Sequence, residues 1–205
     1  MATVILDPST SDRLIRERQE KGLDSYDEVW EGVYVMPPIA NLDHQDQVGR
    51  WCAICVEVIE KPRLGRVQPG ANVSDREENL EYNFRVPDVV VVLNGGKARD
   101  CGTHWFGGPD FLLEIASPGD RTNENITFYE HIETRELLIV DRDSRALSLY
   151  RLSNSRLRLD GQSRSSSPQW LQSDVLPLKF RWAGSRAEPH TEVVRTGRKR
   201  GRWIV

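Results

Sequence analysis

The sequence predicts a mixed α/β (α+β) fold, in which a mixed β-sheet is flanked by helices. Three short runs rich in apolar residues, at 89–93, 111–116 and 136–141, are typical of strands that are buried on both faces. From Val48 to Ile59, apolar residues recur three and four positions apart, which predicts a helix with one buried face. Strands and helices in this order indicate one sheet with helices packed against it.

The composition is that of a soluble domain with terminal extensions. Of the 205 residues, 38% are hydrophobic and 29% charged, and no apolar run is long enough to span a membrane, so we expect no membrane association. The formal net charge of -3 neither requires nor excludes nucleic acid. Three cysteines and no export signal predict reduced thiols and a cytoplasmic location. We expect an N-terminal helical extension (1–28), one domain (29–182) and a basic C-terminal tail (183–205).

The first elements surround the start of the domain. Residues 9–24 predict an exposed helix with N-capping side chains at its start. Residues 26–36 predict a strand or hairpin arm that ends at Pro37 and Pro38.

The helix from about Asp43 onward, which Asp43 is expected to cap, contains a CxxC pair. No second Cys/His pair at zinc-finger spacing follows Cys52 and Cys55, so we interpret both as small buried apolar residues. His44, at the start of the same helix, is expected at the surface or as a capping residue rather than as a ligand.

Two predicted strands each carry one acid within an apolar environment. Asp88 opens the run 89–93, and Glu114 lies inside the run 111–116. A buried carboxylate persists only when it is paired, hydrogen-bonded or bound to a metal. Two carboxylates on neighbouring strands would form a site for Mg²⁺, which prefers oxygen ligands. The structural alternatives are a turn role for Asp88 after Pro87 and an arginine partner for Glu114.

The segments after each acid-bearing strand complete the prediction. Residues 94–103 predict a mobile loop beside the site, and this loop carries Lys97. A helix is expected from Asp120 or Thr122 to about Ile132, then the strand 136–141 and a hairpin partner at 146–152. A last edge strand is expected at 175–180. The basic tail offers possible phosphate contacts, or a solvated end, at Arg198, Lys199 and Arg200.

Three blocks of this sequence resemble the Uma-type family of restriction endonucleases, which belongs to the PD-(D/E)XK nuclease superfamily. They are the VPDVVV block around Asp88, the GPDFLLEIASPGDR block around Glu114 and the RELLIVD block that ends at Asp141. The resemblance extends over about 31–152, with the blocks in the family's order.

The resemblance implies a restriction endonuclease-like core with a phosphodiesterase site that depends on Mg²⁺ or Mn²⁺. Asp88 and Glu114 match the motif acids, and Glu31 resembles the family's additional N-terminal acid. With the Ile115 carbonyl, these acids would hold a cation that polarises the scissile phosphate.

One position departs from the family pattern. Relatives commonly have a lysine four residues before the tyrosine of the helix that follows the glutamate strand, and here that position is Asn125. Asparagine can orient water but carries no charge. Arg121, one turn earlier, or Lys97 from the loop would then have to supply the cation.

These observations lead to two main hypotheses. The first is a metal-dependent DNA endonuclease that acts as a homodimer without an organic cofactor, with Glu31, Asp88 and Glu114 as cation ligands and Asn125 or Arg121 positioning water. The second is a catalytically inactive family member that binds nucleic acid or a protein partner, for which Asn125 is the main support. A third reading, in which the acids are structural, makes the chain an assembly component.

Overall fold

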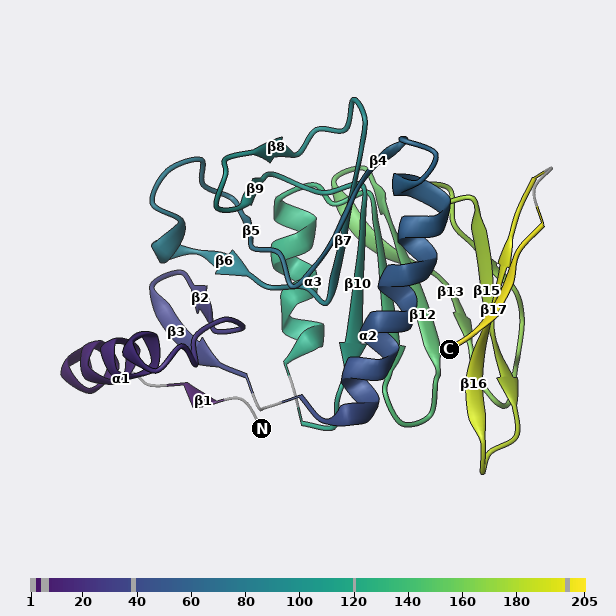
Figure 1. Cartoon of the computed structure of the whole chain (residues 1–205), viewed down its shortest axis with the longest axis horizontal. Coiled ribbons are helices and arrows are strands. Elements are labelled where there is room, and N and C mark those ends of the chain that lie inside the picture. Colours follow the sequence, from purple (N-terminus) through teal and green to yellow (C-terminus); the bar gives the residue numbers. More distant parts are fainter. Residues whose placement is uncertain (1–2, 5–7, 38–39, 120, 198–199) are drawn as a thin grey trace.

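The computed structural model describes residues 3–4, 8–37, 40–119, 121–197 and 200–205. Three sheets lie next to one another, with a central sheet between an N-terminal and a C-terminal one (Figure 1). Over the described ranges, no helix has both the length and the apolar character needed to cross a bilayer.

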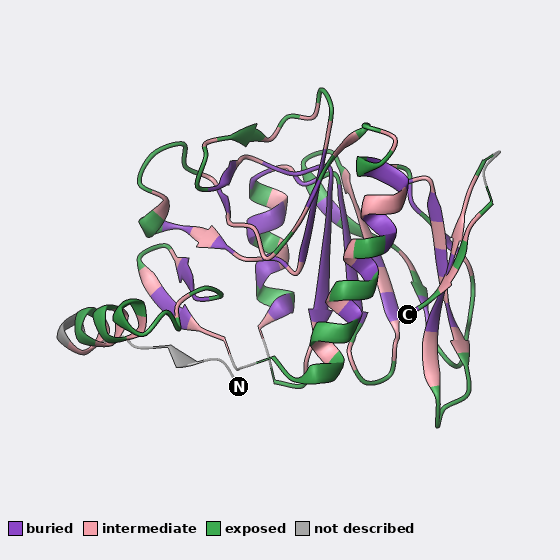
Figure 2. Ribbon diagram, in the orientation of Figure 1, coloured by how far each residue is buried: buried purple, intermediate pink, exposed green. Residues whose placement is uncertain are grey.

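The central sheet has the strand order β13-β12-β11-β10-β7-β4. Its strands are β4 (Gly65–Pro69), β7 (Val89–Leu93), β10 (Phe111–Ala116), β11 (Glu136–Asp141), β12 (Leu147–Ser153) and β13 (Arg156–Ser163). β10 and β11 are parallel, and all other neighbours in this sheet are antiparallel. The three strands predicted from apolar runs are adjacent in its middle and almost entirely buried (Figure 2). The predicted mixed fold is confirmed.

Helices cover both faces of this sheet. Helix α2 (Leu42–Cys55), which continues as the π-helical turn η1 (Val56–Glu60), packs on the face that carries Phe111 and Leu113. Helix α3 (Thr122–His131) packs on the face that carries Leu112. Because side chains alternate along a strand, the positions two before and two after Leu112 also belong to the α3 face. Glu114 therefore faces α3.

Helix α2 begins two residues earlier than a cap at Asp43 would allow. The side chain of Asn41 caps the helix by accepting a hydrogen bond of 2.9 Å from the backbone N–H of His44. Asp43 instead occupies the first turn, where a carboxylate interacts favourably with the helix dipole. This shift turns His44 toward the end of the central sheet.

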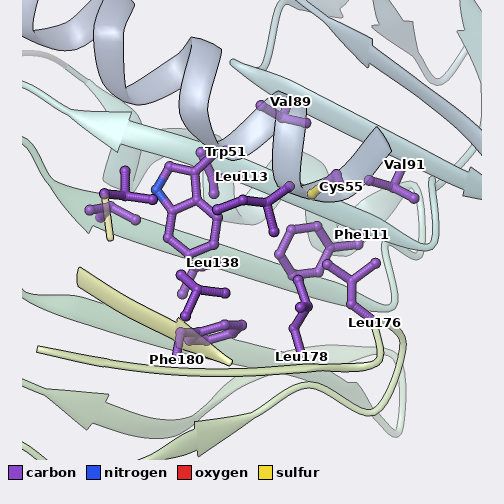
Figure 3. Packing of buried hydrophobic residues seen from close by; sticks show 14 of the residues in the cluster. Trp51, Cys55, Val89, Val91, Phe111, Leu113, Leu138, Leu176, Leu178 and Phe180 are labelled. Carbon is purple, nitrogen blue, oxygen red and sulfur yellow. The ribbon is translucent and has the colours of Figure 1, made fainter. Parts of the chain in front are cut away.

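The larger core lies between α2, the central sheet and the C-terminal sheet. Figure 3 shows Trp51 of α2 above Phe180 of the C-terminal sheet, and their ring centroids are 5.9 Å apart in an edge-to-face arrangement. Cys55 is fully buried in the same cluster, as the small-hydrophobe interpretation expects. The central sheet is thus sandwiched, which fixes the ends of β7 and β10 in space.

The N-terminal sheet has the order β1-β3-β2-β6-β5-β9-β8. Its strands are β1 (Thr3–Val4), β2 (Glu28–Trp30), β3 (Val33–Met36), β5 (Val73–Ser74), β6 (Phe84–Arg85), β8 (Arg99–Asp100) and β9 (Trp105–Phe106). Helix α1 (Pro8–Glu20) precedes the β2–β3 hairpin, and the 3₁₀ turn η2 (Leu80–Tyr82) precedes β6. The Arg18 side chain on α1 donates two hydrogen bonds to Asp27, which anchors the helix to the hairpin.

The C-terminal sheet has the order β14-β15-β16-β17. Its strands are β14 (Leu171–Gln172), β15 (Leu178–Gly184), β16 (Pro189–Arg195) and β17 (Arg202–Ile204). Residues 183–205, expected as a basic tail, thus contain two strands and part of a third. They form strands because Val193 and Val205 are buried in the larger core, and Thr191 is also buried.

Candidate active site

A pocket of about 410 Å³ opens where β7 begins and β10 ends. It is bordered by the β2–β3 hairpin, the start of α2 and the start of α3, which are distant in sequence. The acids that line it are Asp27, Glu28, Asp88 and Glu114. The basic side chains that line it are Arg18, His44, Arg121 and Arg142.

The strand register brings the two motif acids together. In the antiparallel β7–β10 pair, Val89 lies opposite Leu113, so Asp88 and Glu114 occupy the next positions along the same pair. Both positions belong to the α3 face by alternation, since Val90 and Leu112 lie in the α3 cluster. Two carboxylates thereby share one pocket at one end of the sheet.

Hydrogen bonds hold each acid in place. The backbone N–H of Ile115 donates to Asp88 Oδ2 at 2.7 Å, and the Tyr129 hydroxyl donates to Glu114 Oε1 at 2.5 Å. Burial and the adjacent charge of Glu114 raise the pKa of Tyr129 well above its ordinary value, so this phenol stays a donor at neutral pH. Ile115 also lines the pocket, although its side chain belongs to the core.

His44 is a site residue that the sequence interpretation did not assign. Its side chain is 13% exposed, lines the pocket, and places Nε2 3.3 Å from Asp88 Oδ2. His44 was expected at the surface or as a capping residue. Asn41 caps the helix instead, and His44 lies in its first turn with its side chain in the pocket. A histidine at the start of a core helix was the only sequence signal.

Glu31 does not reach the pocket, in contrast to what the resemblance implied. It forms the two-residue β2–β3 turn with Gly32, and both residues have positive φ, 50° and 84°, as a type I′ hairpin turn requires. Its exposed side chain is not among those that line the pocket. Glu28, at the start of β2, occupies the pocket instead.

Glu28 is 9% exposed and accepts two hydrogen bonds. Val86 donates from its backbone N–H at 2.9 Å, and Trp30 donates from its indole N–H at 2.7 Å. Burial raises the pKa of Glu28, and the charge of Asp88 raises it further. Glu28 is therefore a buried acid of the pocket in addition to the two motif acids, and it is less readily ionised than an exposed glutamate.

Asn125 and Arg121 both line the pocket, from α3 and from the residue before it. The guanidinium of Arg121 lies 4.3 Å from the Trp30 ring centroid and forms hydrogen bonds with Glu124. This pairing raises the pKa of Arg121 and lowers that of Glu124. Asn125 is buried and bonded to Arg85, a buried arginine that sequence reasoning did not single out.

Three arginines form the cationic side of the pocket. Arg18 is paired with Asp27, Arg121 with Glu124, and Arg142 with Asp143. A guanidinium has five N–H groups, more than a single carboxylate partner accepts, so these ion pairs do not by themselves use up the donors of each arginine. Such groups bind phosphate in a bidentate manner.

The basic residues proposed from the loop and tail lie elsewhere. Lys97 follows the end of β7, whereas Asp88 precedes its start, so the length of the strand separates the 94–103 loop from the pocket. Lys97 is paired with Glu133 at 2.7 Å. Arg200 is exposed beside β17 and lines neither of the two hollows described here. Arg198 and Lys199 lie outside the described residues.

The donor chemistry of the pocket fits a hard divalent cation. In the part of the chain that the structure describes, no three His, Cys, Asp or Glu side chains form a metal-binding group. Mg²⁺, however, usually takes only one or two protein carboxylates and completes its shell with water or phosphate oxygens. Asp88, Glu114 and the Ile115 carbonyl offer oxygen ligands of this kind.

A second hollow of about 460 Å³ adjoins the pocket along α2. The two share Tyr26, Gln45 and Asp88. The surface around Asp88 therefore extends beyond a single compact cavity.

Comparison with known proteins agrees with this fold. A solved structure described as "a putative nuclease belonging to DUF820" from Anabaena variabilis is similar, with a TM-score of 0.56 and 16% sequence identity over 72% of this chain and 80% of that one. At this identity the likeness shows the fold. No curated protein sequence matches the chain. The model of the Uma2 family, described as "Putative restriction endonuclease", matches residues 15–184. Since that match covers most of the chain, the chain belongs to the Uma2 family.

Proposed function

We propose that this protein is a DNA endonuclease that hydrolyses phosphodiester bonds with Mg²⁺ or Mn²⁺ at the pocket around Asp88 and Glu114. The observation that carries the proposal is the β7–β10 register, which places both acids on the same face and at the same end of the sheet. The family supports a nuclease, and restriction endonuclease-like families generally use divalent metals. The arginines on the pocket wall suit a phosphate-bearing substrate.

The chain's own residues have distinct roles in this proposal. Asp88 and Glu114 would hold the cation, with Asp88 oriented by the Ile115 N–H and Glu114 by the Tyr129 hydroxyl. When bound, the cation supplies Lewis acidity that polarises a phosphate and lowers the pKa of water. Arg121 and Arg142 bind the negative charge of the backbone, which positions the scissile group. The adjoining hollow leaves room for a polymeric substrate to continue past Asp88.

The test is cleavage of supercoiled plasmid DNA with Mg²⁺, Mn²⁺ or a chelator, by the native protein, Asp88→Asn and Glu114→Gln. These variants keep the size of each side chain and one acceptor oxygen but remove the charge. We expect the native protein to cleave only with metal, and each variant to lose at least about 100-fold of the rate, as when an electrostatic contributor is removed from an active site.

Glu133→Gln is the matched control, because Glu133 is a paired surface carboxylate near the other end of β7. Its cleavage rate should equal that of the native protein. If Asp88→Asn and Glu114→Gln cleave as well as this control, the activity does not come from the pocket and the proposal fails.

Asn125 supports a second candidate function, a family member that binds nucleic acid without cutting it. A neutral amide replaces the expected cation, so metal binding and phosphate binding are retained while hydrolysis is lost. Duplex binding by fluorescence anisotropy, with no cleavage by the native protein under any metal condition, would favour this function over the first.

The substrate and assembly state complete the proposal. Duplex DNA has two strands, so a homodimer would place one site at each. Sedimentation equilibrium should then give twice the mass of the 23.5 kDa chain, and plasmid should be linearised as well as nicked. The three free cysteines are compatible with a reducing, cytoplasmic location.

A further inference from the structure

Arg85 is a buried cation next to the pocket wall, and its guanidinium is held on both sides. Only 6% of the residue is exposed. The guanidinium carbon lies 4.5 Å from the Trp30 ring centroid and 4.3 Å from that of Phe128. Trp30 itself lines the pocket. Arg85 is therefore a fixed charge directly behind the surface that a ligand would contact.

Hydrogen bonds fix the orientation of this guanidinium. Nη1 donates to the carbonyls of Val29 and Phe84, at 2.9 and 3.0 Å, and to Asn83 Oδ1 at 3.1 Å. Nε donates to Asn125 Oδ1 at 3.0 Å. Four acceptors around one stacked cation leave it little freedom to rotate.

The bond to Asn125 determines which way the carboxamide of Asn125 faces. The two ends of an asparagine amide are often ambiguous, and their assignment depends on hydrogen-bond partners. Arginine is only a donor, so the amide atom that faces Arg85 must be the oxygen. The nitrogen, with its two N–H donors, then points away from Arg85.

Among the described residues, the hydrogen bonds leave the amide nitrogen of Asn125 without an acceptor. No described residue accepts a hydrogen bond from Asn125 Nδ2, although Asn125 lines the pocket together with Asp88 and Glu114. The nearby positive charge also polarises the carboxamide, which makes its N–H groups better donors. N–H groups bind only acceptors, and hydrogen bonds to a charged oxygen are the strongest of these, so the ligand atom that these donors suit best is an anionic oxygen.

We propose that Arg85 is a positioning residue that orients Asn125 as a double N–H donor for a phosphate oxygen in the pocket. The proposal rests on the nuclease function for the identity of the ligand, a backbone phosphate of nucleic acid. Arg85 thereby supplies, through Asn125, part of the positive character that the missing lysine would have brought. Asn125 contacts the phosphate, and Arg85 acts through Asn125.

The experiment follows the side-chain amide resonances of Asn125 by NMR as inorganic phosphate is added, in the native protein, Arg85→Gln, Arg85→Lys and Asn125→Asp. The Asn125→Asp spectrum assigns the resonances, since they are absent from it. We expect phosphate to shift the native resonances, Arg85→Gln to lose the shift, and Arg85→Lys to restore part of it. A lysine can still donate to Asn125 Oδ1. Partial recovery of the shift in Arg85→Lys would therefore not be explained by a loss of packing alone.

Cleavage kinetics provide the second readout. Arg85→Gln and Asn125→Asp should each lower kcat by about 100-fold while KM changes less, as expected for a donor that acts on developing charge. Asn125→Asp keeps an acceptor for Arg85, so it should remain folded even if Arg85→Gln is unstable. Arg151→Gln is the control, because Arg151 is a partly buried arginine paired with Glu136 that lines neither hollow.

The outcomes separate this inference from the nuclease function. A phosphate shift that depends on Arg85, in a native protein that never cleaves DNA, supports the inference and removes the nuclease function. Cleavage by the native protein, with equal kcat in Arg85→Gln and Asn125→Asp, supports the nuclease and overturns the inference. A native Asn125 resonance that phosphate does not move also overturns it.

Discussion

The backbone N–H of Ile115 donates a hydrogen bond of 2.7 Å to Asp88 Oδ2, so one motif acid is fastened to the strand that carries the other. The backbone pairing of β7 and β10 ends at Leu113 and Val89. One step further along the strands, the Asp88 carboxylate accepts the hydrogen bond that a backbone carbonyl would otherwise accept. Asp88 therefore has a structural role and a proposed ligand role through the same carboxylate.

The two roles of Asp88 are separable by substitution. Asp88→Asn keeps an oxygen that accepts from Ile115, so its free energy of unfolding should lie close to that of the native protein. Asp88→Ala leaves this N–H without its acceptor and should lose about 1–2 kcal/mol. Both variants should lose metal-dependent cleavage. Urea unfolding measures the difference in stability, and the plasmid assay measures the loss of cleavage. Equal stability of the two variants would mean that the hydrogen bond contributes nothing.

Asn125→Lys, the substitution that restores the family's lysine, should not increase activity on its own. The new ammonium would lie beside the buried Arg85 guanidinium, which loses its acceptor and gains a like charge. We expect a loss of stability of about 2 kcal/mol, by thermal or urea unfolding, with cleavage no higher than in the native protein.

The double variant Arg85→Gln/Asn125→Lys removes that repulsion and should recover stability relative to Asn125→Lys. A double-mutant cycle gives the coupling between the two positions directly. Additive effects, within about 0.5 kcal/mol, would show that Arg85 and Asn125 do not interact in solution.

The sheet and the pair of motif acids could be predicted because their signals are local. The apolar runs around Asp88 and Glu114 identify buried strands, and alternation within each strand decides which way each acid faces. The position of Glu28 illustrates the limit of such signals. Glu28 and Glu31 lie three residues apart on one hairpin, and only the turn geometry, with positive φ at Glu31, determines that Glu28 enters the pocket.

The other site residues depend on contacts between distant segments. Arg85 and Asn125 are 40 residues apart and meet because β6 and α3 approach the same edge of the pocket. His44 reaches Asp88 because the helix cap is Asn41 rather than Asp43. Neither contact leaves a pattern in the sequence. The sequence prediction placed Lys97 beside the site for the same reason. The end of the sheet at which its loop lies depends on the direction of β7, which the sequence does not show.

A buried acid in the C-terminal sheet predicts a pH dependence of stability. Burial alone would raise the pKa of Glu192, but its pairs with Arg181 and Arg202, both at 2.7 Å, outweigh burial and lower the pKa below the ordinary value of 4.5. A carboxylate with a lowered pKa stabilises the folded state above its unfolded pKa, and this contribution is lost as the pH falls through the folded pKa.

Glu192→Gln should therefore cost about 1 kcal/mol at neutral pH, a modest value because both arginines remain partly solvated. The difference from the native protein should shrink as the pH falls below 4.5. Urea unfolding across this range measures it, with Glu188→Gln, an exposed position near the turn of the same hairpin, as control. A difference that stays constant with pH would contradict the proposed ion pairs.

Thiol labelling tests the interpretation of the cysteines. Burial raises the pKa of the Cys55 thiol from 9.0 to about 12, which lowers its thiolate fraction by about 1000-fold, and burial also raises the pKa of Cys52. Cys101, which is partly exposed beyond β8, should react first with a thiol reagent under native conditions. Cys52, which borders the second hollow, should follow more slowly, and Cys55 should react only on unfolding. Mass spectrometry of labelled peptides gives the order, and Cys101→Ser should abolish the fast phase alone. Rapid labelling of Cys55 in the folded protein would show that α2 opens from the central sheet, and would remove the packing on which the position of β7 and β10 depends.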